Sequence, residues 1–84
     1  MHTLDELIQT ITDIAAAETG LPVADLGPDL DLRGVAGVDS VKVLRMIAKI
    51  ERAYDIELED EDVFSVATVR DVALVVDKSL REPA

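Results

Sequence analysis

A serine at position 40 can do chemistry, and it lies in the short stretch GVDSV of residues 37–41. A serine hydroxyl becomes a nucleophile when a general base lies beside it, and histidine is the usual base. The sole histidine is His2, at the start of the chain, and there is no cysteine. We therefore expect no self-contained hydrolytic catalysis, although another enzyme can still modify the Ser40 hydroxyl.

The aspartates before this serine raise a second kind of chemistry, calcium binding. The stretch DLDLRGVAGVDS begins at Asp29 and has Gly34 at its sixth position, as an EF-hand loop does. It then places Arg33 at the fifth position and Ser40 at the twelfth, where a bidentate glutamate belongs. The acidic run of residues 55–62 lacks the sixth-position glycine. We expect no metal site and interpret the acidic run as a solvated helix start.

Length and charge limit what the chain can be. Its 84 residues suffice for one domain, and we expect residues 1–84 to form a single one. The formal net charge of −10 argues against nucleic-acid binding, which requires cations facing the phosphates. No apolar run approaches the roughly 18 residues of a membrane span. These features favour a cytoplasmic monomer outside the membrane, and the start at Met1 with the short REPA tail favours a discrete protein.

The elements that position this serine are predicted to be helices. Apolar residues recur at intervals of three and four, which predicts a first helix over residues 4–18. Thr3 and Glu6 have the spacing of a capping box at its start, and Gly20 is expected to stop it. A long connection covers residues 20–39, and its leucines indicate that it is pinned across the surface of the bundle.

Three further helices are expected after this connection. The second helix should run from residue 40 or 41 to about 53, with Ser40 as its N-cap. An extended acidic segment then leads to a short helix near residues 60–65. The last helix is expected over residues 69–80, with Thr68 as its N-cap. The predicted fold is all-α, a small four-helix bundle of three main helices and one short one, with a long loop between the first two.

Ser40 has two interpretations in this setting. A serine at a helix N-cap accepts a hydrogen bond from a backbone N–H, which stabilises the helix by about 1 kcal/mol. A serine that follows a long glycine-containing loop is also exposed, and the start of a helix favours an attached phosphate. The residue types alone leave both interpretations open.

Residues 37–76 resemble acyl carrier proteins without a gap. The shared pieces are Gly-x-Asp-Ser before the second helix, YDIEL fourteen residues on, and TVRDV at the opening of the last helix. Asp-Ser alone is a weak motif, whereas the three pieces at this spacing are specific. The first helix and the stretch LPVADLGPDLDL match more loosely, so the resemblance covers nearly the whole chain.

The resemblance implies that Ser40 receives 4′-phosphopantetheine from coenzyme A, through a phosphodiester that a Mg²⁺-dependent phosphopantetheinyl transferase installs. The thiol of this arm then holds acyl groups as thioesters, so we expect a carrier and not an enzyme. In this family acyl chains can lie between the helices. The candidates for lining such a crevice are Val43, Leu44, Ile47, Phe64, Val66 and Val69. Ordinary core packing accounts for the same positions, because helical spacing alone predicts burial.

The resemblance also implies a docking face for the transferase and partner enzymes. We expect Asp39 to help position the serine and the metal site of the transferase. The other expected members of this face are Val41, Arg45, Ala48 and Arg52. Val41 stands where the family usually has leucine, a small change in an apolar contact.

The second helix departs from the family pattern in its charge. It is typically acidic in fatty-acid carriers. Here its one acid is Glu51, and its four basic residues form one stripe, namely Lys42, Arg45, Lys49 and Arg52. A solvated face that compensates nearby acids such as Asp39 and Glu57 is one explanation. The other is that the partners present acidic or neutral docking surfaces, since charge complementarity sets partner choice.

The second explanation favours a polyketide or mixed polyketide–peptide pathway of secondary metabolism. The expected partners are then the acyltransferase and ketosynthase, or the adenylating enzymes, of that pathway. Within the same class, the alternative is an aminoacyl or peptidyl carrier protein of a peptide synthetase. From other classes, the alternatives are an unmodified acidic helical interaction module, in which Ser40 is only a cap, and an acidic calcium-binding protein.

Overall fold

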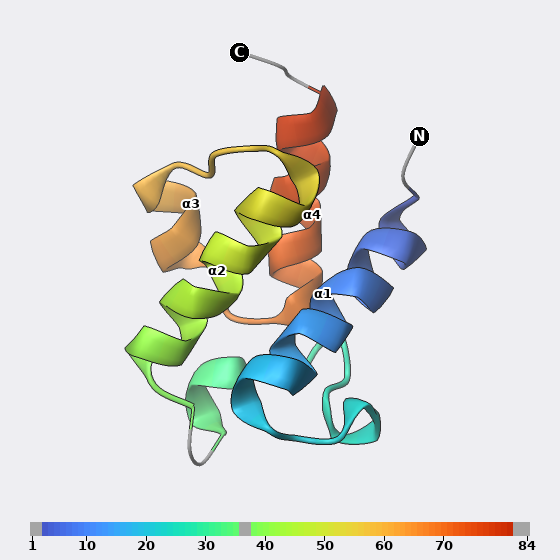
Figure 1. Cartoon of the computed structure of the whole chain (residues 1–84), viewed down its shortest axis with the longest axis vertical. Helices are drawn as coiled ribbons and strands as arrows, with labels where there is room; N and C mark the ends of the chain where they lie inside the picture. Colours follow the sequence, from blue (N-terminus) through green and yellow to red (C-terminus); the bar gives the residue numbers. More distant parts are fainter. Residues whose placement is uncertain (1–2, 36–37, 82–84) are drawn as a thin grey trace.

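The computed structural model describes residues 3–35 and 38–81, which form four α-helices and two short 3₁₀ turns (Figure 1). Their bounds are α1 Leu4–Thr19, η1 Val23–Asp25, η2 Leu32–Gly34, α2 Ser40–Tyr54, α3 Asp60–Ser65 and α4 Val69–Arg81. No strand occurs within these residues, so the predicted all-α bundle with one short helix is confirmed. His2, Gly37 and the tail 82–84 lie outside the described residues.

Local signals define α1 as expected. The Thr3 hydroxyl accepts the Glu6 N–H at 3.1 Å, and the Glu6 carboxylate accepts the Thr3 N–H at 3.4 Å. Gly20 follows the helix in the left-handed conformation, with φ 77°, and its N–H donates to the Ala16 carbonyl. The capping box and the glycine stop are therefore confirmed, and the helix is one residue longer than predicted.

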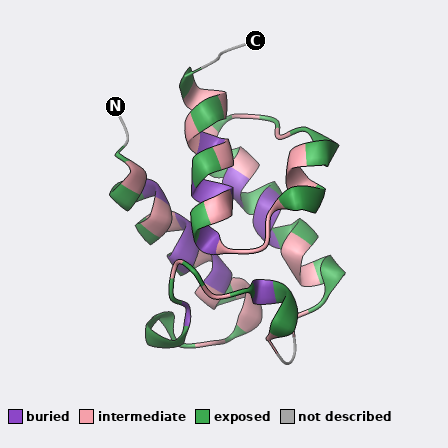
Figure 2. Ribbon diagram, turned by 180° about the vertical axis from the view of Figure 1, so that it is seen from behind, coloured by how far each residue is buried: buried purple, intermediate pink, exposed green. Residues whose placement is uncertain are grey.

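The core lies where α1 packs against α2 and α4 (Figure 2). Each of these helices turns one aliphatic face inward, as its apolar spacing requires. The buried apolar residues of the three helices are Leu7, Ile11, Ala15, Met46, Ile47, Ile50, Val69, Val72, Ala73 and Val76. The short helix α3 buries no residue fully and lies at the side of this core.

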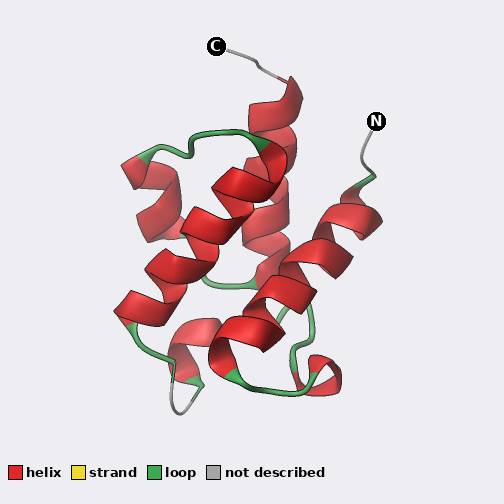
Figure 3. Cartoon of the chain, viewed as in Figure 1, coloured by secondary structure: helices red, strands yellow, loops and turns green. Residues whose placement is uncertain are grey.

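The long connection between α1 and α2 is pinned to the bundle by its own leucines and by α4. Leu26 and Leu32 are buried in the same core as the helices. The Leu32 N–H donates to the Ala67 carbonyl at 2.9 Å, and the Arg70 N–H donates to the Pro28 carbonyl at 3.0 Å. Figure 3 shows the connection crossing the end of the bundle at which α1 ends and α2 begins. The expectation of a pinned loop is confirmed.

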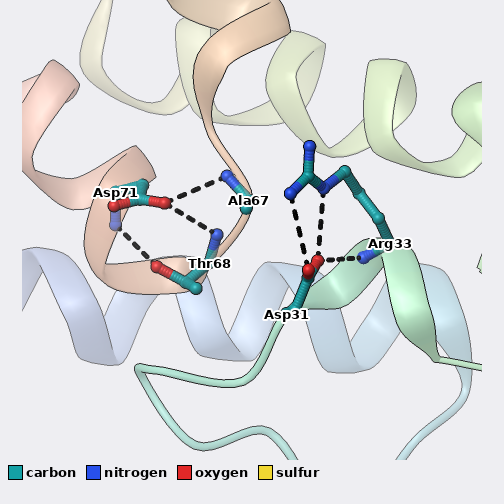
Figure 4. A network of polar contacts seen from close by, with 5 residues as sticks. All are labelled: Asp31, Arg33, Ala67, Thr68 and Asp71. Carbon is teal, nitrogen blue, oxygen red and sulfur yellow. Dashed lines mark hydrogen bonds and ion pairs between the residues drawn. The ribbon is translucent and has the colours of Figure 1, made fainter.

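The turn between α3 and α4 is fixed by Asp71. Its Oδ2 accepts the N–H groups of Ala67 at 3.1 Å and Thr68 at 3.2 Å (Figure 4). The Thr68 hydroxyl in turn accepts the Asp71 N–H at 3.0 Å, as the predicted N-cap does. This reciprocal cap holds Ala67 in place, and Ala67 is the residue that anchors the long connection.

One poorly exposed carboxylate joins α1 to α2. Glu18, in the last turn of α1, has a side chain that is 8% exposed. Its Oε2 accepts from Lys49 Nζ at 2.7 Å, and its Oε1 lies 3.7 Å from Arg45 Nη1. The hydrogen bond from Lys49 holds the pKa of Glu18 below its usual 4.5. Burial opposes this effect, and the charges of Lys49 and Arg45 add to it.

We expect Glu18→Gln to lower the melting temperature by a few degrees near neutral pH, because two cations lose their carboxylate. Since the pKa of Glu18 is lower in the folded than in the unfolded chain, its contribution is complete above the usual value of 4.5 and is lost as the pH falls through the lowered folded value. The difference between variant and parent should therefore vanish in acid.

Thermal unfolding followed by circular dichroism, from about pH 7 to about pH 3, measures this difference. Asp77→Asn is the matched control, since its carboxylate pairs with Arg81 on the same helix at 3.2 Å and with no other described cation. If the difference in melting temperature between Glu18→Gln and the parent stays constant down to acid pH, the ion pairs do not link α1 to α2.

Candidate functional site

Ser40 is the first residue of α2 and not its N-cap, so that prediction is wrong. The N-cap is Asp39, whose backbone is extended (φ −118°, ψ 178°) and whose Oδ1 accepts the Lys42 N–H at 2.9 Å. Aspartate and serine are equally good N-caps, and adjacent in sequence they compete for the role. Here the helix begins one residue too early for Ser40 to cap it.

This correction leaves the Ser40 hydroxyl uncommitted. Ser40 is exposed, and its hydroxyl makes no hydrogen bond to another described residue. It stands at the start of a 15-residue helix, whose first N–H groups favour a negatively charged oxygen nearby. The same N–H groups would stabilise a phosphate ester on this hydroxyl, and the ester would leave the Asp39 cap unchanged.

We expect alanine substitutions at the two neighbouring positions to differ in their effect on stability. Asp39→Ala should lower the free energy of unfolding by about 1 kcal/mol, because a Lys42 N–H loses its acceptor. Ser40→Ala should change it by less than about 0.5 kcal/mol, as is usual for an exposed side chain, because its hydroxyl has no hydrogen bond to another described residue. Urea unfolding followed by circular dichroism compares them, and equal losses for the two variants would contradict this assignment of the cap.

A hollow of about 260 Å³ opens beside Ser40, between the first turns of α2 and the end of α3. Its wall is mostly apolar, and Phe64, which lines it, is 79% exposed. The described residues that line it are Arg33, Val38, Asp39, Ser40, Val43, Leu44, Val63, Phe64 and Val66. The serine therefore stands at the wall of an apolar hollow, and Arg33 stands there with it.

Sequence reasoning found part of this wall. Of the six predicted crevice residues, the structure brings together Val43, Leu44, Phe64 and Val66. It does not bring Ile47 and Val69 there, because both are buried in the core among α1, α2 and α4. The unpredicted members are Arg33, Val38 and Val63. Val63 had a signal as the neighbour of Phe64 in a short helix, whereas nothing local marks Arg33.

The outer face of α2 carries the predicted docking residues in exposed positions, namely Val41, Arg45, Ala48 and Arg52. The basic stripe is only partly available on this face, since Glu18 engages Arg45 and Lys49. The two acids named from the sequence as compensators of this stripe, Asp39 and Glu57, form no ion pair with it within the described residues. The carboxylate of Asp39 accepts the backbone of Lys42, and Glu57 forms no ion pair with a described residue.

The first two aspartates of the EF-hand-like stretch bind arginines, Asp29 that of α4 and Asp31 that of its own loop. Arg70 Nε donates to Asp29 at 2.8 Å and Arg33 Nε to Asp31 at 3.2 Å, and these hydrogen bonds hold the pKa of both carboxyls below the usual 3.8. No group of three or more His, Asp or Glu side chains within residues 3–35 and 38–81 is arranged to hold a metal ion. In this same part of the chain, no helix is both long and apolar enough to span a bilayer.

Comparison with known proteins identifies the family. Residues 9–76 match the family model described as the phosphopantetheine attachment site. The chain is 35% identical over 85 residues to an acyl carrier protein of Streptomyces coelicolor, an alignment that covers 98% of this chain and 92% of the relative. The chain belongs to the acyl carrier protein family. It is also 28% identical over 78 residues to an acyl carrier protein of an Exiguobacterium species, with 93% and 99% covered.

Membership confirms three of the expectations drawn from the sequence. An acyl carrier protein is a carrier and not an enzyme, and its cofactor is 4′-phosphopantetheine, whose thiol holds acyl groups as thioesters. Its partners are a phosphopantetheinyl transferase and biosynthetic enzymes. The surroundings of Ser40 fit such a group, because an exposed hydroxyl that bonds no other described residue, a helix start and an apolar hollow lie together there.

Proposed function

We propose that Ser40 carries the 4′-phosphopantetheine arm, and that residues 1–84 act as one carrier domain for acyl intermediates. One observation carries this proposal: Asp39 caps α2, so that the Ser40 hydroxyl is exposed and free of hydrogen bonds to the other described residues. The first N–H groups of α2 favour the phosphodiester that attachment creates.

The chain supplies the acceptor and the transferase supplies the catalytic groups. Attachment forms a bond from Ser40 Oγ to phosphorus and breaks the pyrophosphate bond of coenzyme A, which releases adenosine 3′,5′-bisphosphate. The Oγ proton must leave to a base, and no histidine lies within the described residues to accept it. Asp39 is the nearest carboxylate in sequence, and it stands beside Ser40 in the wall of the hollow. We also propose a cytoplasmic location, because attachment consumes coenzyme A.

We expect the chain to gain one phosphopantetheine adduct when it is incubated with coenzyme A, Mg²⁺ and a promiscuous phosphopantetheinyl transferase. Intact mass spectrometry detects the adduct. Ser40→Ala should abolish it, because no other hydroxyl stands at the same place. Ser65→Ala, which removes another exposed serine whose hydroxyl donates to the Asp62 carbonyl, should leave it intact. A parent chain that stays unmodified would contradict the proposed attachment at Ser40.

We further propose that the partners belong to a polyketide or mixed polyketide–peptide pathway, with an acyltransferase and a ketosynthase among them. The support is the charge of α2, which has one acid, Glu51, and a stripe of four basic residues, namely Lys42, Arg45, Lys49 and Arg52. Glu18 engages the two middle members, which leaves Lys42 and Arg52 without an ion pair to a described residue. A partner with an acidic or neutral docking surface fits those two cations.

We expect Arg52→Glu to speed acylation by fatty-acid synthase enzymes several-fold, because it makes the charge of α2 more like that of the acidic helix of fatty-acid carriers. The rate of acyl transfer to the modified protein at low salt measures the effect. Lys78→Glu is the control for net charge, because Lys78 is exposed on α4 and forms no ion pair with a described residue. Arg45→Glu is a poorer choice, since it places a second carboxylate beside Glu18. No gain of Arg52→Glu over Lys78→Glu would count against the proposed docking surface.

A further inference from the structure

We infer that Arg33 is an oxyanion-binding residue of the hollow beside Ser40. Its ligand is a singly charged oxyanion of the loaded carrier, either the phosphodiester of the arm or a carboxylate at the far end of the acyl group. The inference rests on the proposed function, since it takes Ser40 as the attachment residue. The sequence gives no local reason for a cation at this position.

Arg33 is held in one orientation by its own loop. Asp31 caps η2, and its Oδ1 accepts both the backbone N–H of Arg33 at 2.9 Å and the Nε–H at 3.2 Å (Figure 4). Its Oδ2 accepts from Nη2 at 3.4 Å. The guanidinium has five N–H donors, so the others stay unused within the described part of the chain. An oriented cation loses little conformational freedom when it binds a ligand.

A contact distant in sequence places Arg33 at the hollow. The preceding residue, Leu32, donates its N–H to the Ala67 carbonyl at 2.9 Å, and Val66, the residue before Ala67, lines the hollow together with Arg33. The Arg33 side chain is 64% exposed, so a ligand in the hollow can reach it. The walls there are otherwise apolar, apart from Ser40 and Asp39.

Charge explains why a cation matters at this place. The chain carries a formal charge of −10, and attachment adds a phosphodiester at Ser40, directly after Asp39. Arg33 is the sole cation among the described residues that line the hollow. Its planar fork matches a phosphate or carboxylate in two-point contact, and apolar walls weaken the screening of such a pair by water.

The competing explanation is that Arg33 only closes its loop through Asp31. Both side chains are more than half exposed, and such a pair contributes little to stability. A residue with that role alone would not respond when the arm or an acyl group is attached. Arg81 provides the matched reference, because it forms an equally local pair with Asp77 at 3.2 Å on α4, outside the hollow.

The test follows the arginine Nε–H resonances by NMR in four forms of the protein: unmodified, with the arm, with a pentanoyl arm and with a glutaryl arm. If the phosphodiester is the ligand, the Arg33 resonance shifts when the arm is attached. If the acyl carboxylate is the ligand, it shifts with glutaryl and not with pentanoyl. Either result supports the inference, and an Arg33 resonance that never moves more than that of Arg81 overturns it.

A variant pair gives a second readout. In Arg33→Gln, the phosphorus resonance of the attached arm, or the nuclear Overhauser contacts from glutaryl methylenes to Val43 and Val66, should change relative to the parent. Arg81→Gln should leave both unchanged, and Arg33→Lys should restore part of the effect. Mass spectrometry distinguishes a failure of the proposed function from a failure of the role inferred for Arg33. An arm that fails to attach overturns the proposed function and this inference together, whereas an attached arm with a silent Arg33 overturns this inference alone.

Discussion

The hydrogen bond from the Leu32 N–H to the Ala67 carbonyl, 2.9 Å long, joins the middle of the long connection to the turn before α4. Burial of the Leu32 side chain supports it from the core, and Asp71 fixes the other end by accepting the Ala67 N–H. The short helix α3 buries no residue fully and packs against the core through Val63, so its position depends largely on what holds its two ends. Because this bond fixes one of them, Arg33, the end of α3 and the start of α2 border one hollow.

The ion pairs of the bundle are distributed unevenly among its basic residues. Of the eight basic residues, five form an ion pair with a described acid, namely Arg33, Arg45, Lys49, Arg70 and Arg81. Two of the other three, Lys42 and Arg52, lie on α2, and no described acid pairs with either. The α1–α2 contact thus engages the middle of the basic stripe, and its two ends have no ion pair to a described acid. The docking proposed above would therefore use members of the stripe that the fold does not.

The sequence predicts well whatever depends on near neighbours. The capping box of Thr3 and Glu6 and the apolar period of each helix are local, so the helix bounds follow within a residue or so. The choice of Asp39 over Ser40 as N-cap is local too, but propensity ranks the two alike. Helical spacing marks Ile47 as buried without saying against which neighbour. Arg33 reaches the hollow only through a bond to residue 67, which no local pattern reports.

The roles of Asp39 and Ser40 are linked by the chemistry of the attachment that we propose at Ser40. If Ser40 were the cap, esterifying its oxygen would alter the acceptor that stabilises α2. With Asp39 as the cap, α2 keeps the same acceptor before and after attachment. Such an attachment would bring a carboxylate close to a phosphodiester, and two such charges a few ångströms apart in water repel by about 1 kcal/mol. The N–H groups at the start of α2 would offset part of that repulsion. A cation held at the same hollow, as Arg33 is, would offset a further part of it without contacting the cap.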